Sequence, residues 1–112
     1  MTKIEAIIQT SKLPAVKEAL TDLGLNGMTL SEIYGHGSSP AKIGEFRGHQ
    51  YKIDLLPGIK LEMVVLDDQV EDAVEAIVKN SATGKIGDGK IFLSRIDDIV
   101  RIRNQQRGVA AL

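Results

Sequence analysis

The pattern of hydrophobic and polar positions changes its period twice in the first third of the chain. Residues 3–9 (KIEAIIQ) form a short apolar run rich in Ile, which predicts a strand. The next segment repeats apolar residues at helical spacing: Leu13, Val16, Leu20 and Leu23. Ser11 is the expected N-cap of this helix and Gly24 the residue that ends it. Residues 28–34 (MTLSEIY) alternate apolar and polar side chains and predict a half-buried strand.

The second half of the chain repeats this order. Residues 59–66 (IKLEMVVL) and 91–96 (IFLSRI) each predict a strand. Between them, a helix is predicted by apolar residues at helical spacing: Val70, Ala73, Val74, Ile77 and Val78. Asp68 is its expected N-cap, with Glu71 completing a capping box. Residues 99–103 (IVRIR) predict a short additional strand.

Two segments lack a regular period. Residues 35–58 are rich in Gly and Pro and longer than an ordinary connection, which is typical of functional or disordered loops. We therefore expect a flexible effector loop over residues 36–56. The segment 104–112 is polar and then rich in small residues, and we expect a loose C-terminal tail there.

The order strand, helix, strand, long loop, strand, helix, strand predicts one α+β domain over residues 1–112 with a ferredoxin-like βαββαβ sandwich. The two helices are expected to cover one face of the sheet. In the first strand, Ile4, Ala6 and Ile8 alternate with a second set that includes Ile7, so the other face is partly apolar. Large exposed apolar patches are uncommon on monomers, and we expect this face to pack in an oligomer.

Composition and charge narrow the function classes. The 112 residues are 43% hydrophobic and carry a net charge of −1, which does not favour binding to nucleic acid or to anionic lipid. The chain has no Cys, which excludes disulfides and thiolate chemistry. The N-terminus has no long apolar run and no segment is long enough to cross a membrane, so we expect a cytoplasmic protein without membrane insertion.

The glycine-rich turn at residues 83–90 carries the strongest chemical signal. Its closely spaced glycines can present backbone N–H groups to an anion, and its lysines add positive charge. Gly84, Gly89 and Lys90 match the spacing of a P-loop, but Ile91 replaces the Ser or Thr that would bind magnesium. The turn also leads from a helix into a strand, the reverse of a P-loop. The pattern disfavours a Walker nucleotidase and leaves an anion-binding turn or a turn with solvated lysines.

Outside the glycine-rich turn, two arginines and two histidines are the remaining candidates for binding or catalysis. Arg101 and Arg103 alternate on an expected strand and would suit a phosphate group, although a charged edge strand has the same pattern. His36 and His49, the two histidines, both lie in the long loop without a Cys to pair with. We therefore expect no catalytic site and no metal site.

Three segments in order resemble the PII signal-transduction family: residues 3–20 (KIEAIIQTSKLPAVKEAL), 83–92 (TGKIGDGKIF) and 99–103 (IVRIR). The resemblance covers essentially the whole chain, and the glycine-rich turn is its most specific part. In the long loop, FRGHQY resembles the family motif Tyr-Arg-Gly-Ala-Glu-Tyr with changes at three of six positions.

The resemblance implies a non-catalytic homotrimer that binds ATP or ADP in the clefts between subunits, with Mg²⁺ accompanying ATP. The flexible loop would control a protein target, a transporter or an enzyme of nitrogen or carbon metabolism. The family's nucleotide-binding positions correspond here to Ile7, Thr29, Gly35, Gly37, Ser38, Glu62, Val64, Gly87, Asp88, Gly89, Lys90, Arg101 and Arg103. The two arginines would come from the neighbouring subunit. Tyr51 stands where some members are uridylylated.

The chain departs from the family where 2-oxoglutarate would bind. Ser39 replaces a Gln that holds the bridging magnesium, Pro40 replaces a Lys, and Gly58 replaces a Lys that contacts a carboxylate. Each lost charge-assisted contact costs about 1.5–3 kcal/mol, so we expect 2-oxoglutarate sensing to be weak or lost. The alternatives left open are a PII-like trimer that senses another small ligand or a metal for a different transporter, and a small phosphatase on the same fold.

Overall fold

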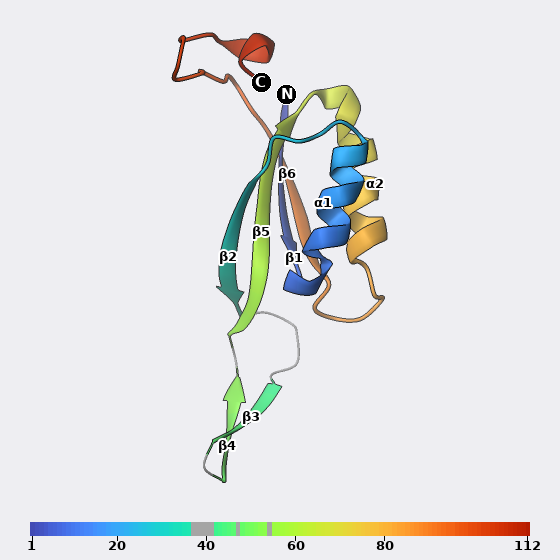
Figure 1. Ribbon diagram of the computed structural model, residues 1–112, viewed down its shortest axis with the longest axis vertical. Coiled ribbons are helices and arrows are strands. Elements are labelled where there is room, and N and C mark those ends of the chain that lie inside the picture. The colour runs from blue at the N-terminus through green and yellow to red at the C-terminus, as the bar shows by residue number, and fades with distance from the viewer. Residues whose placement is uncertain (37–41, 47, 54) are drawn as a thin grey trace.

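A four-stranded antiparallel sheet carries two helices on one of its faces (Figure 1). The computed structural model describes residues 1–36, 42–46, 48–53 and 55–112. The strand order is β2-β5-β1-β6, which is the ferredoxin-like arrangement predicted from the sequence. The elements are β1 Thr2–Ile8, α1 Leu13–Asp22, β2 Thr29–Gly35, β3 Lys42–Phe46, β4 His49–Ile53, β5 Leu56–Val65, α2 Val70–Ser81 and β6 Gly89–Arg95, with 3-10 turns η1 Thr10–Lys12, η2 Asp67–Gln69 and η3 Gly108–Ala111.

The core lies between the central strands and the helix layer. Alternate side chains of β1 and β5 are buried against one side of α1 and α2, as the two periods in the sequence predict. Full burial of one large aliphatic side chain contributes roughly 1.5–3 kcal/mol. The buried hydrophobic residues are Ile4, Ala6, Ile8, Val16, Leu20, Ile59, Leu61, Met63, Val65, Val70, Ala73 and Ile77.

The helix ends agree with the sequence at one position and differ at two. Gly24 follows α1 with a φ of 79°, and its N–H donates to the carbonyl of Thr21, which confirms the predicted helix end. The predicted N-caps Ser11 and Asp68 are wrong. Both residues lie inside the 3-10 turns η1 and η2 that precede the helices, and the N–H of Leu66 instead donates to the side chain of Gln69 at 3.0 Å.

The prediction of an additional strand over residues 99–103 is also wrong. Val100 forms a single bridge with Arg107, and the chain turns back between them. Gln105, with a φ of 59°, donates its N–H to the carbonyl of Arg101 at 2.8 Å. Arg101 and Arg103 therefore do not alternate along an extended segment. Residues 104–112 continue into η3, and the expected looseness of this tail stays a prediction about its motion.

In chain order, a hairpin of β3 and β4 connects β2 to β5, and it forms a separate two-stranded sheet (Figure 1). The periodicity did not predict this hairpin. Gly48 lies in its turn with a φ of 79°, and Phe46 pairs with His49. The flexibility of the effector loop over residues 36–56 stays a prediction. The residues 37–41, 47 and 54 lie outside the described part.

The face of the sheet away from the helices carries a network of ion pairs. Lys3 contacts Glu62 at 3.1 Å, and Lys60 contacts Glu5 at 3.0 Å and Glu62 at 3.4 Å. The hydrogen bond from Lys3 and that from Lys60 hold the pKa of Glu62 below its usual value. Cross-strand register places Ile7 on this face too, beside Lys60 and Lys90. The face is therefore mixed in character, and its four central charges, Lys3, Glu5, Lys60 and Glu62, are paired inside one chain.

The N-terminus is fixed at the same end of the sheet as the C-terminal segment (Figure 1). The Met1 ammonium group lies 3.1 Å from the carboxylate of Asp67, which also accepts a hydrogen bond from the Thr2 hydroxyl at 2.8 Å. Among the described residues, no helix is long and apolar enough to cross a membrane.

Gly89→Ala is expected to destabilise the sheet strongly. An added Cβ would overlap the carbonyl oxygen of Ile7, and the φ of 107° is one that side-chain-bearing residues rarely adopt. The free energy of unfolding should fall by about 3 kcal/mol or more in urea titrations. Gly27→Ala is the control, because a Cβ there meets nothing within 4 Å. Equal unfolding midpoints for the two variants would contradict this reading of the β1–β6 contact.

Candidate functional site

The glycine-rich turn between α2 and β6 is organised around the carboxylate of Asp88. This carboxylate accepts the N–H of Thr83 at 2.7 Å, the N–H of Gly84 at 3.0 Å and the hydroxyl of Thr83. The Thr83 hydroxyl first, and then the backbone N–H groups, hold the pKa of Asp88 below its usual value. The N–H groups of Thr83 and Gly84 are therefore used inside the turn and do not face an external anion.

The other half of the turn is attached to the end of β1. The side-chain amide of Gln9 donates to the carbonyl of Gly87 at 3.1 Å. Gly87 and Gly89 have φ values of 105° and 107°, and Gly89 lies against the backbone of Ile7. Lys90, the next residue, pairs with Ile7 across the strands and is exposed. The turn thus brings together several predicted nucleotide-binding residues: Ile7, Gly87, Asp88, Gly89 and Lys90.

A cavity of about 530 Å³ lies near the other end of the sheet. Three predicted nucleotide-binding residues line it: Thr29, Glu62 and Val64. Thr29 and Glu62 are direct cross-strand partners, which explains why they share this wall. Sequence reasoning missed the rest of the lining: Lys3, Gly24, Leu25, Asn26, Gly27, Met63, Val65, Gln69, Ile99, Ala111 and Leu112.

The charge in this cavity is balanced within the chain. Glu62, on the wall, is paired with Lys3, which also lines the cavity. Lys3 lies opposite Val64 in the antiparallel register of β1 and β5, which the matched sequence pattern of the two strands does not give. The cavity therefore combines an apolar wall with an amine and a carboxylate, a mixture suited to a ligand with an apolar ring and polar edges.

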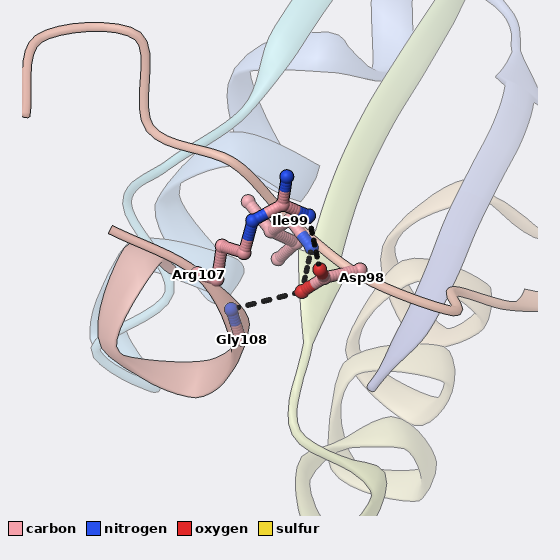
Figure 2. Close-up of polar contacts among 4 residues, drawn as sticks. All are labelled: Asp98, Ile99, Arg107 and Gly108. Carbon is pink, nitrogen blue, oxygen red and sulfur yellow. Dashed lines mark hydrogen bonds and ion pairs between the residues drawn. The ribbon is translucent and has the colours of Figure 1, made fainter. Parts of the chain in front are cut away.

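The residues after β6 fold into a hydrogen-bonded loop (Figure 2). Asp98 accepts the N–H of Ile99 at 2.8 Å, the N–H of Gly108 at 3.0 Å and the guanidinium of Arg107 at 2.9 Å. The bond from Arg107, followed by the two N–H groups, holds the pKa of Asp98 below its usual value. Arg101, which is half-buried, donates to the side chain of Gln106 at 2.6 Å and to the carbonyl of Ala110 at 3.0 Å.

One chain does not bring all predicted site residues together. The turn that holds Lys90 lies at one end of β6, and the segment with Arg101 and Arg103 follows the other end (Figure 1). The seven residues of β6 alone span roughly 20 Å. Gly35 ends β2, opposite Leu56.

The other candidates in the long loop are only partly described. Gly37, Ser38, Ser39 and Pro40 lie outside the described residues. Tyr51 pairs with Gly44 in the β3–β4 hairpin, and its modification stays a prediction. Within the described residues, no group of three or more His, Cys, Asp or Glu side chains is placed to hold a metal ion.

The sheet, its helix layer and the glycine-rich turn define a ferredoxin-like α+β domain, and comparison with known proteins places it more closely. The family model described as "Nitrogen regulatory protein P-II" matches residues 1–106. A protein of that name from Mesorhizobium japonicum is 50% identical over 112 residues, covering 100% of both chains. Another from Pasteurella multocida is 45% identical with the same coverage. Nitrogen regulatory protein P-II 2 from Methanothermobacter thermautotrophicus is 48% identical, covering 100% of this chain and 97% of its own.

The chain belongs to the nitrogen regulatory P-II family of signal-transduction proteins. The resemblance first noted in the sequence segments is confirmed over the full length. Members of this family are non-catalytic regulators, so the chain is a regulator and not an enzyme.

Thr83→Val is expected to raise the pKa of Asp88 toward its usual value, because the Thr83 hydroxyl is the largest cause of the depression. A carboxyl with a lowered folded-state pKa stabilises the turn above the unfolded pKa, near 4, and this contribution is lost as pH falls through the folded value. The carboxyl carbon resonance of Asp88, followed by NMR between about pH 2 and 6, measures the shift.

The control for this titration is Thr21→Val, which removes a hydroxyl from an exposed position of α1. The midpoint for Asp88 should stay unchanged in that variant. An unchanged midpoint in Thr83→Val as well would mean that the hydroxyl does not organise the turn.

Proposed function

We propose that this chain forms a homotrimer in the cytoplasm that binds ATP or ADP in clefts between subunits, with Mg²⁺ accompanying ATP. The bound nucleotide sets the conformation of the loop at residues 36–56. That loop then contacts a target protein, a transporter or an enzyme of nitrogen or carbon metabolism. Differential contacts to ATP and ADP would shift the loop between conformations.

The observation that carries this proposal is the separation, on one chain, of two elements that carry candidate phosphate-binding residues. Lys90 and its glycines lie at one end of β6, and Arg101 and Arg103 follow the other end. A single phosphate chain cannot reach both ends within one subunit. A site that uses all of these residues therefore has to combine the turn of one subunit with the arginines of another.

The helix-free face of the sheet supports assembly. Lys3, Lys60, Glu5 and Glu62 pair within one chain, so that the face carries no unbalanced charge at its centre. Ile7 and Val64 are half-buried on the same face and Phe92 is 52% exposed. Burial of these apolar side chains between subunits would add stability that a chain of this size lacks alone.

Gly58 favours a changed response to 2-oxoglutarate. A Cβ at Gly58 would lie 3.2 Å from the carbonyl oxygen of Ile8, which is tighter than an ordinary contact. Gly58 therefore fits the close approach of β5 to the end of β1. The same residue lacks the lysine side chain that the family uses to bind a carboxylate. This favours, as the second candidate function, a P-II regulator that senses a different small ligand in place of 2-oxoglutarate.

Calorimetric titration of the full-length protein with ATP and with ADP tests the central proposal. We expect both nucleotides to bind, and we expect 2-oxoglutarate with magnesium to leave the ATP affinity unchanged within about twofold. Linkage requires that any tightening of ATP by 2-oxoglutarate be reciprocal. A clear tightening would show that Ser39 and Gly58 are compatible with 2-oxoglutarate sensing, and absence of nucleotide binding would overturn the proposal itself.

Subunit mixing tests the assignment of the arginines to the neighbouring subunit. Lys90→Ala and Arg101→Ala should each weaken ATP binding, because each removes a charged group worth about 1.5–3 kcal/mol. When the two variants are unfolded together in equal amounts and refolded, random trimers contain intact sites at about a quarter of their interfaces. We therefore expect calorimetry of the mixed trimers to show tight ATP binding at about a quarter of the sites. If mixing recovers none while each parent still forms trimers, the two residues do not serve one shared site.

A further inference from the structure

The C-terminal segment, residues 104–112, folds back on the body of the protein. After the turn at Gln105, Arg107 bridges to Val100, and the N–H of Gly108 donates to the carbonyl of Ile99 at 3.1 Å. The segment then ends in η3, Gly108–Ala111. Its position is thus set by contacts with residues 98–101, which directly follow β6.

The end of this segment reaches the cavity that was described above. Ala111 and Leu112 line it together with Thr29, Glu62 and Val64. These last three residues belong to the proposed nucleotide site, and the apolar wall and polar edges of the cavity suit the base of the nucleotide. The C-terminal residues therefore occupy part of the boundary of the space that a nucleotide base would enter.

The same segment also engages an arginine of the proposed site. The Nη1 group of Arg101 donates to Gln106 at 2.6 Å, and its Nη2 group donates to the carbonyl of Ala110 at 3.0 Å. Both acceptors belong to residues 104–112. Two N–H groups of the Arg101 guanidinium are thus used within its own chain.

We propose that the C-terminal segment is an autoinhibitory element that competes with nucleotide at both places. In the closed arrangement it lines the base-binding wall of its own subunit and retains the Arg101 that would serve the next subunit. This inference rests on the proposed nucleotide site. A ligand that binds only when the segment is open has an apparent affinity equal to its intrinsic affinity multiplied by the fraction of molecules that are open.

One of the contacts that hold the segment closed is an exposed ion pair, which suits reversible opening. Asp98 joins Arg107 and Gly108 to the chain after β6 (Figure 2), and the side chains of Asp98 and Arg107 are 42% and 68% exposed. Exposed ion pairs add little stability, because water screens both charges. This ion pair therefore adds little to the free energy that a bound nucleotide has to supply to open the segment.

A contrary arrangement makes the opposite prediction. Gln106 and Ala110 use two N–H groups of Arg101, and a guanidinium has five. If these bonds served to orient Arg101 for phosphate, breaking the segment's attachment would weaken nucleotide binding. The sign of the change in affinity therefore separates autoinhibition from positioning.

The experiment compares Asp98→Ala and Arg107→Ala with the native full-length chain by ATP calorimetry. Both variants break the same ion pair, and we expect both to tighten ATP binding by about two- to fivefold, the factor that corresponds to the worth of an exposed pair. Removal of the Arg107 charge would by itself weaken the binding of an anion, so tightening in that variant comes from release of the segment. Asp97→Ala removes a neighbouring carboxylate that makes no contact with Arg107 among the described hydrogen bonds and serves as the charge control.

Hydrogen exchange provides the direct readout on the native protein. Saturating ATP should speed exchange at the amides of Gly108 and Leu112, which donate within the closed segment. Slower exchange with ATP, or weaker ATP binding in both variants, would overturn autoinhibition while the nucleotide site stands. If Asp97→Ala tightened ATP binding as much as Asp98→Ala, autoinhibition would also be overturned. Absence of ATP binding in the native chain would remove the proposed function and this inference together.

Discussion

The central position of β1 is the constraint on which the rest of the structure depends. This strand pairs with β5 on one side and β6 on the other, so its side chains have only two directions, toward the helices or away from them. Ile4, Ala6 and Ile8 take the first direction and build the core. Lys3 and Glu5 take the second and anchor the ion-pair network. At the end of the same strand, the backbone of Ile7 lies against Gly89. The next residue after the strand, Gln9, donates a hydrogen bond to the glycine-rich turn.

This arrangement places candidate site residues at both ends of one sheet. The turn with Lys90 lies where β1 ends, and the cavity with Glu62 and Lys3 lies toward its beginning. Glu62 belongs to both the cavity wall and the network on the open face, so a ligand beside Glu62 would act on a side chain that also faces the subunit contact proposed here. The cavity wall and the open face of the sheet therefore share the Lys3–Glu62 ion pair.

Local patterns were sufficient for the parts of the fold that depend on periodicity. The two strand–helix units follow from the spacing of residues such as Ile4, Leu20 and Ile77, because burial on one face imposes that spacing. The end of α1 followed from Gly24, whose conformation few other residues adopt. The caps of both helices were misplaced, because a 3-10 turn precedes each and its presence is not visible in hydrophobic spacing.

Contacts between distant residues explain the failures. The segment 99–103 alternates like a strand, but Asp98 accepts hydrogen bonds from Arg107 and Gly108 and requires a reversal that no local pattern encodes. The cavity was found only in part for the same reason. Thr29 and Glu62 were indicated by family resemblance, whereas Leu112 joins them from the far end of the chain.

The position of the two termini has a practical consequence for anyone who produces this protein. An affinity tag fused to Leu112 would extend from a residue on the cavity wall. A tag before Met1 would replace the ammonium group that pairs with Asp67, beside the start of α2. Both common sites of fusion therefore lie next to the region where ligand affinity would be measured, whereas the β3–β4 hairpin stands at the opposite end of the molecule (Figure 1). Purification of the untagged chain, or removal of the tag by a protease, keeps an artefact of the expression vector out of the binding data.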